Sequence, residues 1–257
     1  INFDRMSLRA THKSQLQDSE FDVLVIGAGI NGAASASALA HRGLRTALVD
    51  ARDFAGYTSQ NSSNLIWGGI KYLETFEFAL VRRLCSSRNV LMRAYPTAVR
   101  ETRFLAAISS TAPHSRLAVW LGAWFYWFLG SCVTRIPRLL SRDALKRAEP
   151  VVNAGMTQGA VEYSDALLVD GDARFVYSLV RRAADAGCVT VNYLNVVNAQ
   201  RSGEYWRVDL LDSVDGGKMS TRARVIINAA GPFADPLAGL TNVATGLRHV
   251  LSKGIHL

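Results

Sequence analysis

The hydrophobic positions between residues 21 and 50 change their period, and this change predicts a βαβ unit. Residues 21–26 (FDVLVI) form a short apolar, β-branched run closed by glycines, which is typical of a strand buried on both faces of a parallel sheet. Small residues at 33–41 predict a helix that Gly43 ends, and residues 44–50 (LRTALVD) predict the second strand. The pattern predicts an α/β, Rossmann-like fold.

Further apolar runs predict the elements that follow. Helices are expected at 76–95, 117–134 and 174–187, and strands at 189–197, 205–211 and 224–228. Residues 54–70 are rich in Ser, Asn and Gly, and are expected to form an ordered loop only around a ligand. Residues 1–20 mix acidic and basic side chains without an apolar run, which predicts a tail and no secretory signal.

One uncharged stretch, residues 117–134 (LAVWLGAWFYWFLGSCVT), leaves more than one interpretation open. Its eighteen residues lie between Arg116 and Arg135 and just reach the length that spans a bilayer. Its three Trp and its internal glycines are more typical of a buried helix or of a helix in a membrane interface. The sequence favours burial, with membrane docking second and membrane spanning third.

The formal net charge of +8 arises from one stretch of the chain. Residues 61–150 hold 13 Lys or Arg against 5 Asp or Glu, whereas the rest of the chain holds 16 of each. A local positive field favours anionic partners such as phosphates or acidic lipids. The chain has no aromatic and basic RNA motif and no zinc-finger spacing, so no nucleic acid partner is expected.

The cysteines exclude two kinds of site. Cys85, Cys132 and Cys188 lie far apart, without a CxxC pair or a histidine cluster at metal-ligand spacing. Neither a disulfide framework nor a metal site is therefore expected. A reducing compartment fits best, so the cytoplasm is the predicted location, with a peripheral position on the inner face of the cell membrane as the alternative.

Gly27, Gly29 and Gly32 form a G-x-G-x-x-G pattern between the first predicted strand and the helix. Gly27 allows the tight turn, Gly29 lets the backbone approach a pyrophosphate, and Gly32 lets helix and strand pack closely. The helix N-terminus offers free N–H groups to the phosphates. Asp50 ends the second strand, where a carboxylate accepts hydrogen bonds from ribose hydroxyls. The unit predicts a dinucleotide cofactor without distinguishing FAD from NAD.

Residues 58–72 (TSQNSSNLIWGGIKY) resemble the FAD-dependent glycerol-3-phosphate dehydrogenases, a family of the D-amino-acid-oxidase-like flavoenzymes. The family pattern is close to T-S-x-x-S-S-K-L-I-H-G-G-x-R-Y-L-E, and Leu73 and Glu74 continue the match. Further matching stretches are 162–165 (EYSD), 172–174 (DAR), 228–232 (NAAGP) and 253–256 (KGIH). The resemblance runs from about residue 21 to the end of the chain.

The resemblance implies FAD as the cofactor and a set of residues around it. Hydroxyls and free N–H groups in residues 58–66 suit the pyrophosphate and the edge of the flavin, and glycine at 68 suits a close approach to a flat ring. Residues 228–231 would border the adenosine half. The expected cofactor-binding residues are Gly27, Gly29, Ile30, Asn31, Gly32, Asp50, Thr58, Ser62, Ser63, Asn64, Leu65, Ile66, Gly68, Ala229 and Gly231.

The resemblance also implies oxidation of sn-glycerol 3-phosphate to dihydroxyacetone phosphate by hydride transfer to the flavin, with a quinone or another electron acceptor. Trp67 and Lys71 stand where the family commonly has His and Arg. Trp cannot act as a base, whereas Lys keeps the positive charge but not the two-pronged grip of a guanidinium. Lys71 is the candidate for holding the anionic substrate, and His256 is the candidate base. His12, His41, His114 and His249 have no motif context and are interpreted as structural or surface residues.

Three other functions stay open: a related flavoenzyme for another small hydroxy or amino acid, a noncatalytic FAD-binding fragment, and a nicotinamide-dependent dehydrogenase. The expected architecture is a discontinuous, Rossmann-like FAD-binding domain at residues 21–100 and 160–240. An α+β substrate cap at 101–159 is expected to be inserted in it. Residues 241–257 would begin a further substrate-domain segment that this chain leaves incomplete.

Overall fold

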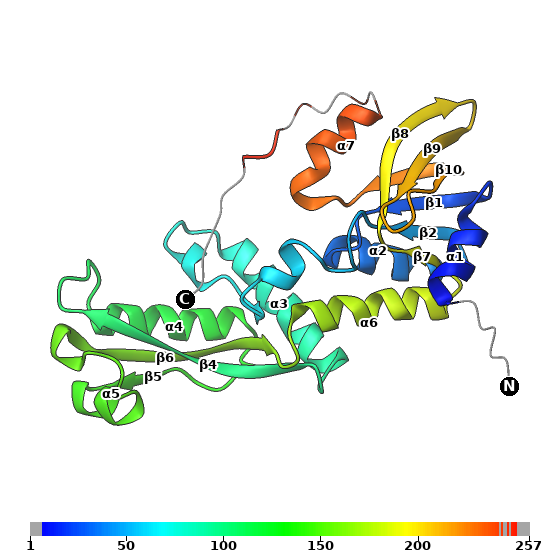
Figure 1. Ribbon diagram of the computed structural model, residues 1–257. Coiled ribbons are helices and arrows are strands. Elements are labelled where there is room, and N and C mark those ends of the chain that lie inside the picture. The colour runs from blue at the N-terminus through cyan, green and yellow to red at the C-terminus, as the bar shows by residue number, and fades with distance from the viewer. Residues whose placement is uncertain (1–6, 242, 244–245, 247, 251–257) are drawn as a thin grey trace, which may run out of the picture. The chain divides into compact units, whose positions relative to one another are not determined.

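The structure is a computed structural model that describes residues 7–241, 243, 246 and 248–250 (Figure 1). The chain divides into two compact units, Ile1–Ser63 with Gly171–Leu257, and Asn64–Asp170. The predicted boundaries after residues 100 and 159 differ from this division. The reason is that β4 (Val99–Ser109) and β6 (Thr157–Leu168) run across both boundaries and pair along nearly their whole length.

The first unit contains a six-stranded sheet in the order β7-β2-β1-β10-β9-β8 (Figure 1). Its strands are β1 (Glu20–Ile26), β2 (Thr46–Val49), β7 (Val189–Val191), β8 (Leu194–Ser202), β9 (Tyr205–Asp212) and β10 (Lys218–Asn228). The first three and β10 run parallel, whereas β9 is antiparallel to both of its neighbours. Residues 189–197 were predicted as one strand, but the left-handed φ of Tyr193 (58°) separates β7 from β8.

The predicted βαβ unit consists of β1, α2 (Ile30–Ala40) and β2, which confirms the Rossmann-like α/β class. Small buried side chains on α2, such as Ala33 and Ala36, let it contact both β2 and α6 (Asp172–Asp185). A short helix, α7 (Ala234–Leu240), follows β10 and contacts β8. The core of the unit includes Leu24, Val49 and Leu210.

Residues 1–20 were predicted to be a tail, and this is wrong for Leu8–Leu16, which form helix α1. The helix starts at an N-cap in which Ser7 Oγ accepts the N–H of Ala10, and it buries Leu16 completely. Arg9 Nη2 lies 2.8 Å from Asp212 Oδ1, and Lys13 Nζ lies 2.5 Å from Asp212 Oδ2. The helix is therefore held by a buried carboxylate from a distant part of the sequence, which no local pattern reveals.

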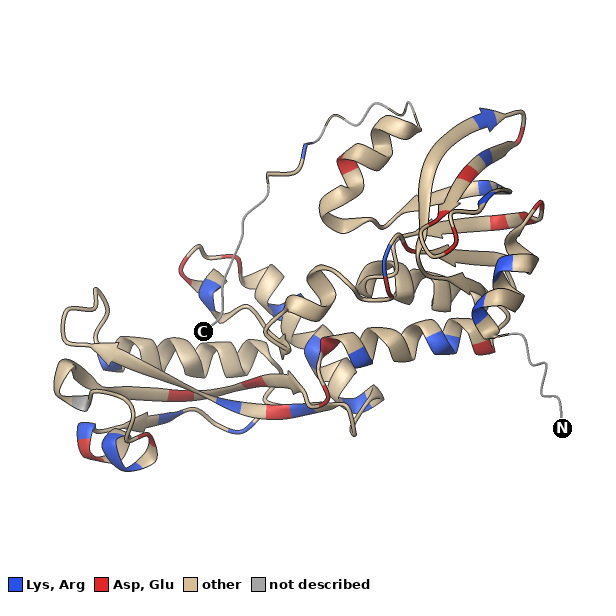
Figure 2. Cartoon of the chain, viewed as in Figure 1, with Lys and Arg blue, Asp and Glu red and all other residues tan. Residues whose placement is uncertain are grey.

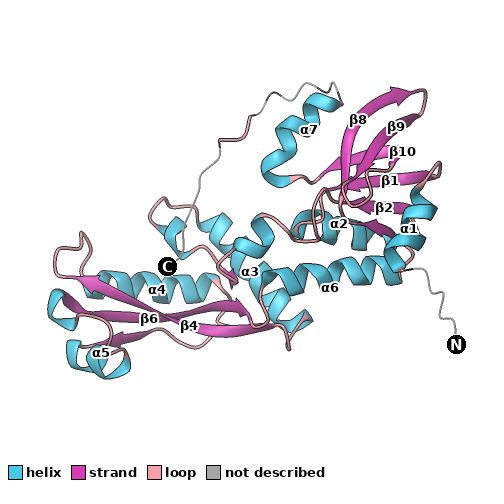
Figure 3. Ribbon diagram, viewed as in Figure 1, coloured by secondary structure: helices cyan, strands magenta, loops and turns pink. Residues whose placement is uncertain are grey.

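The second unit is an antiparallel α+β arrangement around β6 (Figure 3). Strand β4 pairs with β6 along one edge, while β3 (Leu65–Ile66) and β5 (Arg138–Leu140) pair with its other edge. Its helices are α3 (Phe78–Ala94), α4 (Arg116–Leu129) and α5 (Arg142–Ala148), and its 3-10 helices are η2 (Ile70–Leu73) and η3 (Ala154–Met156). A small core forms where Val81 and Cys85 of α3 meet Tyr126 of α4.

The uncharged stretch forms α4, and Figure 2 shows this helix without charged positions beyond its first residue. Ala123 and Tyr126 are buried, whereas Leu117, Leu121 and Phe128 are exposed on the other face. Burial, the favoured interpretation, therefore holds for one face only. Among the described residues, no helix has both the length and the apolar character needed to cross a membrane.

Candidate functional site

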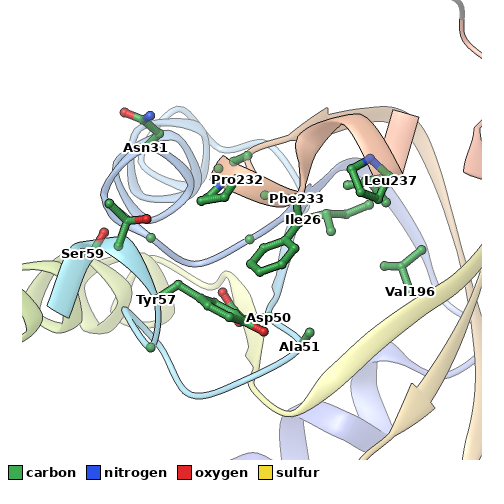
Figure 4. Close-up of a pocket in the computed structure, with 18 of the residues that line it drawn as sticks. Ile26, Asn31, Asp50, Ala51, Tyr57, Ser59, Val196, Pro232, Phe233 and Leu237 are labelled. Carbon is green, nitrogen blue, oxygen red and sulfur yellow. The ribbon is translucent and has the colours of Figure 1, made fainter. Parts of the chain in front are cut away.

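A cavity of about 590 Å³ lies in the first unit, where β1 and β2 end. Its wall comes from the β1–α2 turn, the loop after β2, the start of β8 and the turn between β10 and α7. Figure 4 shows Asn31 and Ser59 at one end and Val196 and Leu237 at the other. The cavity thus has a polar end at the start of α2 and an apolar end at β8. Ligands of open α/β sheets bind at the carboxyl ends of strands in this way.

The three glycines of the β1–α2 turn have different surroundings. Gly27 has a φ of 103°, and a Cβ there would lie 2.7 Å from the carbonyl carbon of Ala229. A Cβ on Gly32 would lie 2.9 Å from the carbonyl carbon of Gly27. A Cβ on Gly29 would meet only Ser59 Oγ, at 3.2 Å. Gly27 and Gly32 are therefore needed for the turn itself, whereas Gly29 keeps the cavity open.

The N-terminus of α2 supplies hydrogen-bond donors to the polar end of the cavity. Ile30 and Asn31 line the cavity, and the N–H of Ile30 donates to Ser59 Oγ at 3.0 Å. First-turn N–H groups have no acceptor within their own helix, and they carry the positive end of its dipole. Among the described lining residues there is no Lys or Arg. An anion bound here would be held by backbone N–H groups and the helix dipole.

Asp50 places a buried carboxylate in the cavity wall directly after β2. Burial raises the pKa of Asp50, and the hydrogen bonds donated by the backbone N–H groups of Arg52 and Ala28 oppose that rise. These donors lie 2.8 Å from Oδ1 and 2.6 Å from Oδ2. Each oxygen keeps further acceptor capacity, so the carboxylate can receive hydroxyl groups of a ligand.

Two aromatic side chains meet over the cavity: Phe233, which by the family resemblance stands in place of a Trp next to the cofactor, and Tyr57, which no motif included. The rings of Tyr57 and Phe233 lie 4.7 Å apart at an angle of 58° (Figure 4). The guanidinium of Arg52 stacks on Tyr57, with 4.6 Å between its carbon and the ring centroid. An isolated aromatic in a polar loop, such as Tyr57, has no periodic signal, so only the structure reveals its contact with Phe233.

His249 also lines the cavity, although the sequence offered no motif for it. Its Nδ1 lies 2.6 Å from Asp235 Oδ1, and its backbone N–H donates to Asp235 Oδ2 at 2.9 Å. These hydrogen bonds lower the pKa of Asp235. His249, interpreted from the sequence as a structural or surface residue, therefore also lies in the wall of the cavity.

The predicted cofactor-binding residues of the first unit divide into two groups. Those that line the cavity are Gly27, Gly29, Ile30, Asn31, Asp50, Thr58, Ala229 and Gly231. Gly32, Ser62 and Ser63 are not part of its lining. Gly32 packs against Gly27, and Ser62 donates a hydrogen bond to the carboxylate of Asp172 at the start of α6. Their roles toward a cofactor stay predictions.

The other predicted site residues lie in the second unit or outside the described chain. Those of the second unit are Asn64, Leu65, Ile66, Gly68 and Lys71. Leu65 and Ile66 form β3, and Gly68 is buried. Lys71 is exposed on η2 and forms no ion pair with the described residues. His256, and with it the predicted catalytic base, lies outside the described residues.

Comparison with known proteins identifies the class to which this site belongs. The FAD dependent oxidoreductase family matches residues 22–257, and the chain belongs to this family. The predicted flavoenzyme class and its FAD cofactor are thereby confirmed. Among similar proteins, D-erythritol 1-phosphate dehydrogenase of Brucella abortus is 36% identical over 92% of this chain and 46% of its own. The glycerol-3-phosphate dehydrogenase of Pseudomonas tolaasii is 37% identical over 83% of this chain and 40% of its own.

Solved structures show the same fold at lower identity. The glycerol-3-phosphate dehydrogenase of Bacillus halodurans complexed with FAD has a TM-score of 0.68 and 23% identity, covering 91% of this chain and 39% of that one. L-alpha-glycerophosphate oxidase of Mycoplasma pneumoniae with FAD bound has a TM-score of 0.67 and 20% identity, over 87% of this chain and 57% of that one. The chain spans less than half the length of the sequence relatives named above.

Proposed function

We propose that the complete protein oxidises a small polyol phosphate, with sn-glycerol 3-phosphate as its first candidate substrate and dihydroxyacetone phosphate as the product. Bound FAD supplies the chemistry by accepting hydride from the carbon that carries the reacting hydroxyl group. The hydroxyl proton then leaves to a base, for which His256 remains the candidate. Relatives named as dehydrogenases of glycerol 3-phosphate and of D-erythritol 1-phosphate support this substrate class.

The cavity of the first unit is the single observation that carries the proposal, because its donors and shape fit the ADP half of FAD. The backbone around Gly29 and the N–H group of Asn31 would hold the pyrophosphate, since the N–H of Ile30 already donates to Ser59 Oγ. The Asp50 carboxylate would accept the ribose hydroxyls. The apolar end formed by Val196 and Leu237 suits a flat aromatic ring such as adenine.

The substrate preference rests on an anion contact at Lys71. This side chain is exposed, and no described acidic group neutralises it. An ammonium group without a protein partner suits a phosphate as a point charge. We propose that Lys71 binds the phosphate of the substrate. The similarity to a D-erythritol 1-phosphate dehydrogenase makes a polyol phosphate longer than glycerol 3-phosphate the second candidate substrate.

The test uses the purified complete protein, its absorbance spectrum and an artificial electron acceptor. We expect flavin absorbance, and turnover of glycerol 3-phosphate or erythritol 1-phosphate well above that of glycerol and erythritol. Equal turnover of phosphorylated and free polyols would contradict the substrate class. Flavin absorbance without any turnover would favour a noncatalytic flavoprotein, and activity that requires added NAD would favour a nicotinamide enzyme. Turnover of amino acids instead would favour a related flavoenzyme with another small substrate.

We also propose that α4 docks the protein on a membrane surface, where a quinone would accept the electrons. Leu117, Leu121, Phe125 and Phe128 are all exposed on one side of the helix. Arg135 and Arg138, in the residues that follow the helix, are exposed although they pair with Glu101 and Glu162. An apolar helix face beside cations is typical of interfacial binding to anionic lipid. Flotation with anionic liposomes should show binding that weakens with salt, whereas no binding at low salt would contradict docking.

A further inference from the structure

The peptide at Gly68 is held on both sides by buried side chains of the second unit. Its N–H donates to Asp165 Oδ1 of β6 at 3.1 Å. Its carbonyl accepts a hydrogen bond from Cys85 Sγ of α3, with 3.6 Å between sulfur and oxygen. Gly68 itself is buried, and a Cβ there would lie 2.8 Å from Cys85 Sγ and overlap the hydroxyl of Tyr126. Only glycine fits this position.

Asp165 is the centre of this network, since its Oδ1 accepts three hydrogen bonds. Besides the Gly68 N–H, it receives Arg88 Nη1 at 2.5 Å and the hydroxyl of Tyr126 at 2.6 Å. The side chains of Arg88 and Asp165 are 1% and 0% exposed. Burial raises the pKa of Tyr126, so its hydroxyl stays protonated and remains a donor. Arg88 is fixed in turn by Asn89 Oδ1, which lies 3.2 Å from its Nε.

Such a network is a costly way to stabilise a fold. Desolvating an ion pair costs several kcal/mol per ion, and packed apolar side chains of the same volume often serve stability as well or better. The network instead fixes a position. Arg88 and Tyr126 hold Asp165 Oδ1 in place, and this oxygen holds the backbone N–H of Gly68. The residues come from α3, α4 and β6, so the three elements together determine where Gly68 lies.

Near Gly68, some side chains pack on the core of the second unit and others are exposed to solvent. Gly69 has a φ of 84° and turns the chain into η2. From this 3-10 helix, Ile70 and Leu73 pack against the core of Val81, Cys85 and Tyr126. Trp67 and Tyr72 remain 38% and 37% exposed, with their rings 5.6 Å apart, and Lys71 is exposed as well. The fixed backbone of residues 67–72 thus exposes the Trp67–Tyr72 ring pair and the ammonium group of Lys71 to solvent.

We propose that Arg88, Tyr126 and Asp165 are positioning residues that hold residues 67–71 in the conformation in which Trp67 and Lys71 meet the substrate. This inference rests on the proposed function for the substrate contact, whereas the anchoring of Gly68 stands on its own geometry. None of the three residues needs to touch substrate or cofactor. Their effect on catalysis passes through the backbone of Gly68 and Gly69.

The test compares Tyr126→Phe with Tyr163→Phe in the complete flavin-loaded protein. Tyr126→Phe removes one donor to Asp165 and keeps the ring, so the fold survives. Tyr163 is the matched control: its ring lies 6.1 Å from that of Tyr126, and its hydroxyl forms no hydrogen bond with the described residues. Two readouts are needed. Hydrogen exchange of a peptide spanning residues 64–75 reports the anchoring, and steady-state kinetics with glycerol 3-phosphate and erythritol 1-phosphate report the catalytic consequence.

For Tyr126→Phe we expect roughly tenfold faster exchange in residues 64–75 and a roughly tenfold lower kcat/KM, mostly through a higher KM, with normal flavin content. Tyr163→Phe should change neither. Unchanged exchange in Tyr126→Phe would overturn the anchoring. Equal effects of both variants, in proportion to their loss of thermal stability, would overturn it too, because the hydroxyl would then serve general stability. If the unmodified protein turns over no polyol phosphate, the proposed function fails, and the exchange measurement still decides the anchoring.

Discussion

The cavity of the first unit combines backbone N–H groups, apolar side chains and the Asp50 carboxylate around an open space, whereas the network around Gly68 consists of buried charged and hydroxyl groups that bond to one another. The cavity leaves its N–H donors and the Asp50 carboxylate able to receive a ligand. In the network, the donors bond to Asp165 and not to a ligand. These hydrogen bonds fix the backbone at Gly68. Variants of the two regions should therefore have different effects: a change in the cavity should remove bound cofactor, and a change in the network should lower stability and alter the backbone at Gly68.

The largest effect is expected from Gly29→Val, which should abolish FAD binding in a protein that still folds. A side chain at residue 29 meets only Ser59 Oγ, so it enters the cavity rather than the core. Flavin absorbance and the melting temperature of the purified protein measure the two effects. Gly32→Val is the control, and it should lose the fold as well, because its Cβ would overlap the backbone of Gly27. A Gly29→Val protein with full flavin content would show that the pyrophosphate does not bind there.

The next effect is loss of stability in Arg88→Met, which leaves Asp165 buried without its cation. Breaking a buried ion pair in this way costs about 3–5 kcal/mol. The free energy of unfolding in urea measures the loss. Arg88→Met combined with Asp165→Leu should recover much of it, since no unpaired charge then remains. A double variant no more stable than Arg88→Met alone would show that packing rather than charge pairing dominates here.

These two variants also separate what the sequence predicts from what it does not. The cavity was foreseen at Gly27, Gly29 and Asp50 because a local pattern of glycines between a strand and a helix has one structural meaning. For Arg88, the sequence predicts only a position in the helix expected at residues 76–95. Its partner Asp165 lies 77 residues further along the chain, and helical periodicity carries no information about such a pairing.

Contacts between residues far apart in the sequence also account for the differences between the predicted and the observed fold. Helix α1 was missed because Arg9 and Lys13 have the polar pattern of a tail, and their buried partner Asp212 belongs to a hairpin near the other end of the chain. The predicted boundaries differ from the two compact units because pairing between β4 and β6 cannot be recognised from local patterns. The periodicity of hydrophobic residues predicts individual helices and strands. Which of them form one compact unit depends on pairing between distant strands.

Lys71→Ala tests whether the fixed segment serves the substrate. A hydrogen bond to a charged group contributes about 1.5–3 kcal/mol, so kcat/KM for the phosphorylated polyol should fall by about one to two orders of magnitude. Lys71→Arg should retain or improve activity, because a guanidinium can bind a phosphate through two donors. Lys146→Ala, an exposed residue of α5, is the matched control and should leave kinetics unchanged. Unaltered kcat/KM in Lys71→Ala would remove this residue from the site.

The first unit also contains a buried charge with ion-pair partners: Asp212, which pairs with Arg9 and Lys13. Burial alone raises its pKa, but hydrogen bonds from Arg9 and Lys13 outweigh burial and lower the pKa to about 2. A lowered pKa in the folded state stabilises the protein above the unfolded value of about 3.9, and this stabilisation is lost as the pH falls through 2. At neutral pH this stabilisation amounts to about 2–3 kcal/mol. Asp212→Asn should flatten the dependence of unfolding free energy on pH between about 4 and 2, whereas Asp185→Asn, at an exposed position, should leave it as it is.

The smallest effect is expected at Gly122 in the interior of α4, and it should have the opposite sign. No atom lies within 4 Å of the position where a Cβ would be added, and its φ is not left-handed. Alanine is about 1 kcal/mol more favourable than glycine inside a helix, so Gly122→Ala should raise the free energy of unfolding by about that amount. Gly68→Ala in the same unit should lower it, because the added methyl group meets Tyr126 and Cys85. Chemical denaturation of the complete protein without lipid measures both changes in the free energy of unfolding. A destabilised Gly122→Ala protein would mean that α4 packs more tightly against its neighbours than the open space at residue 122 indicates.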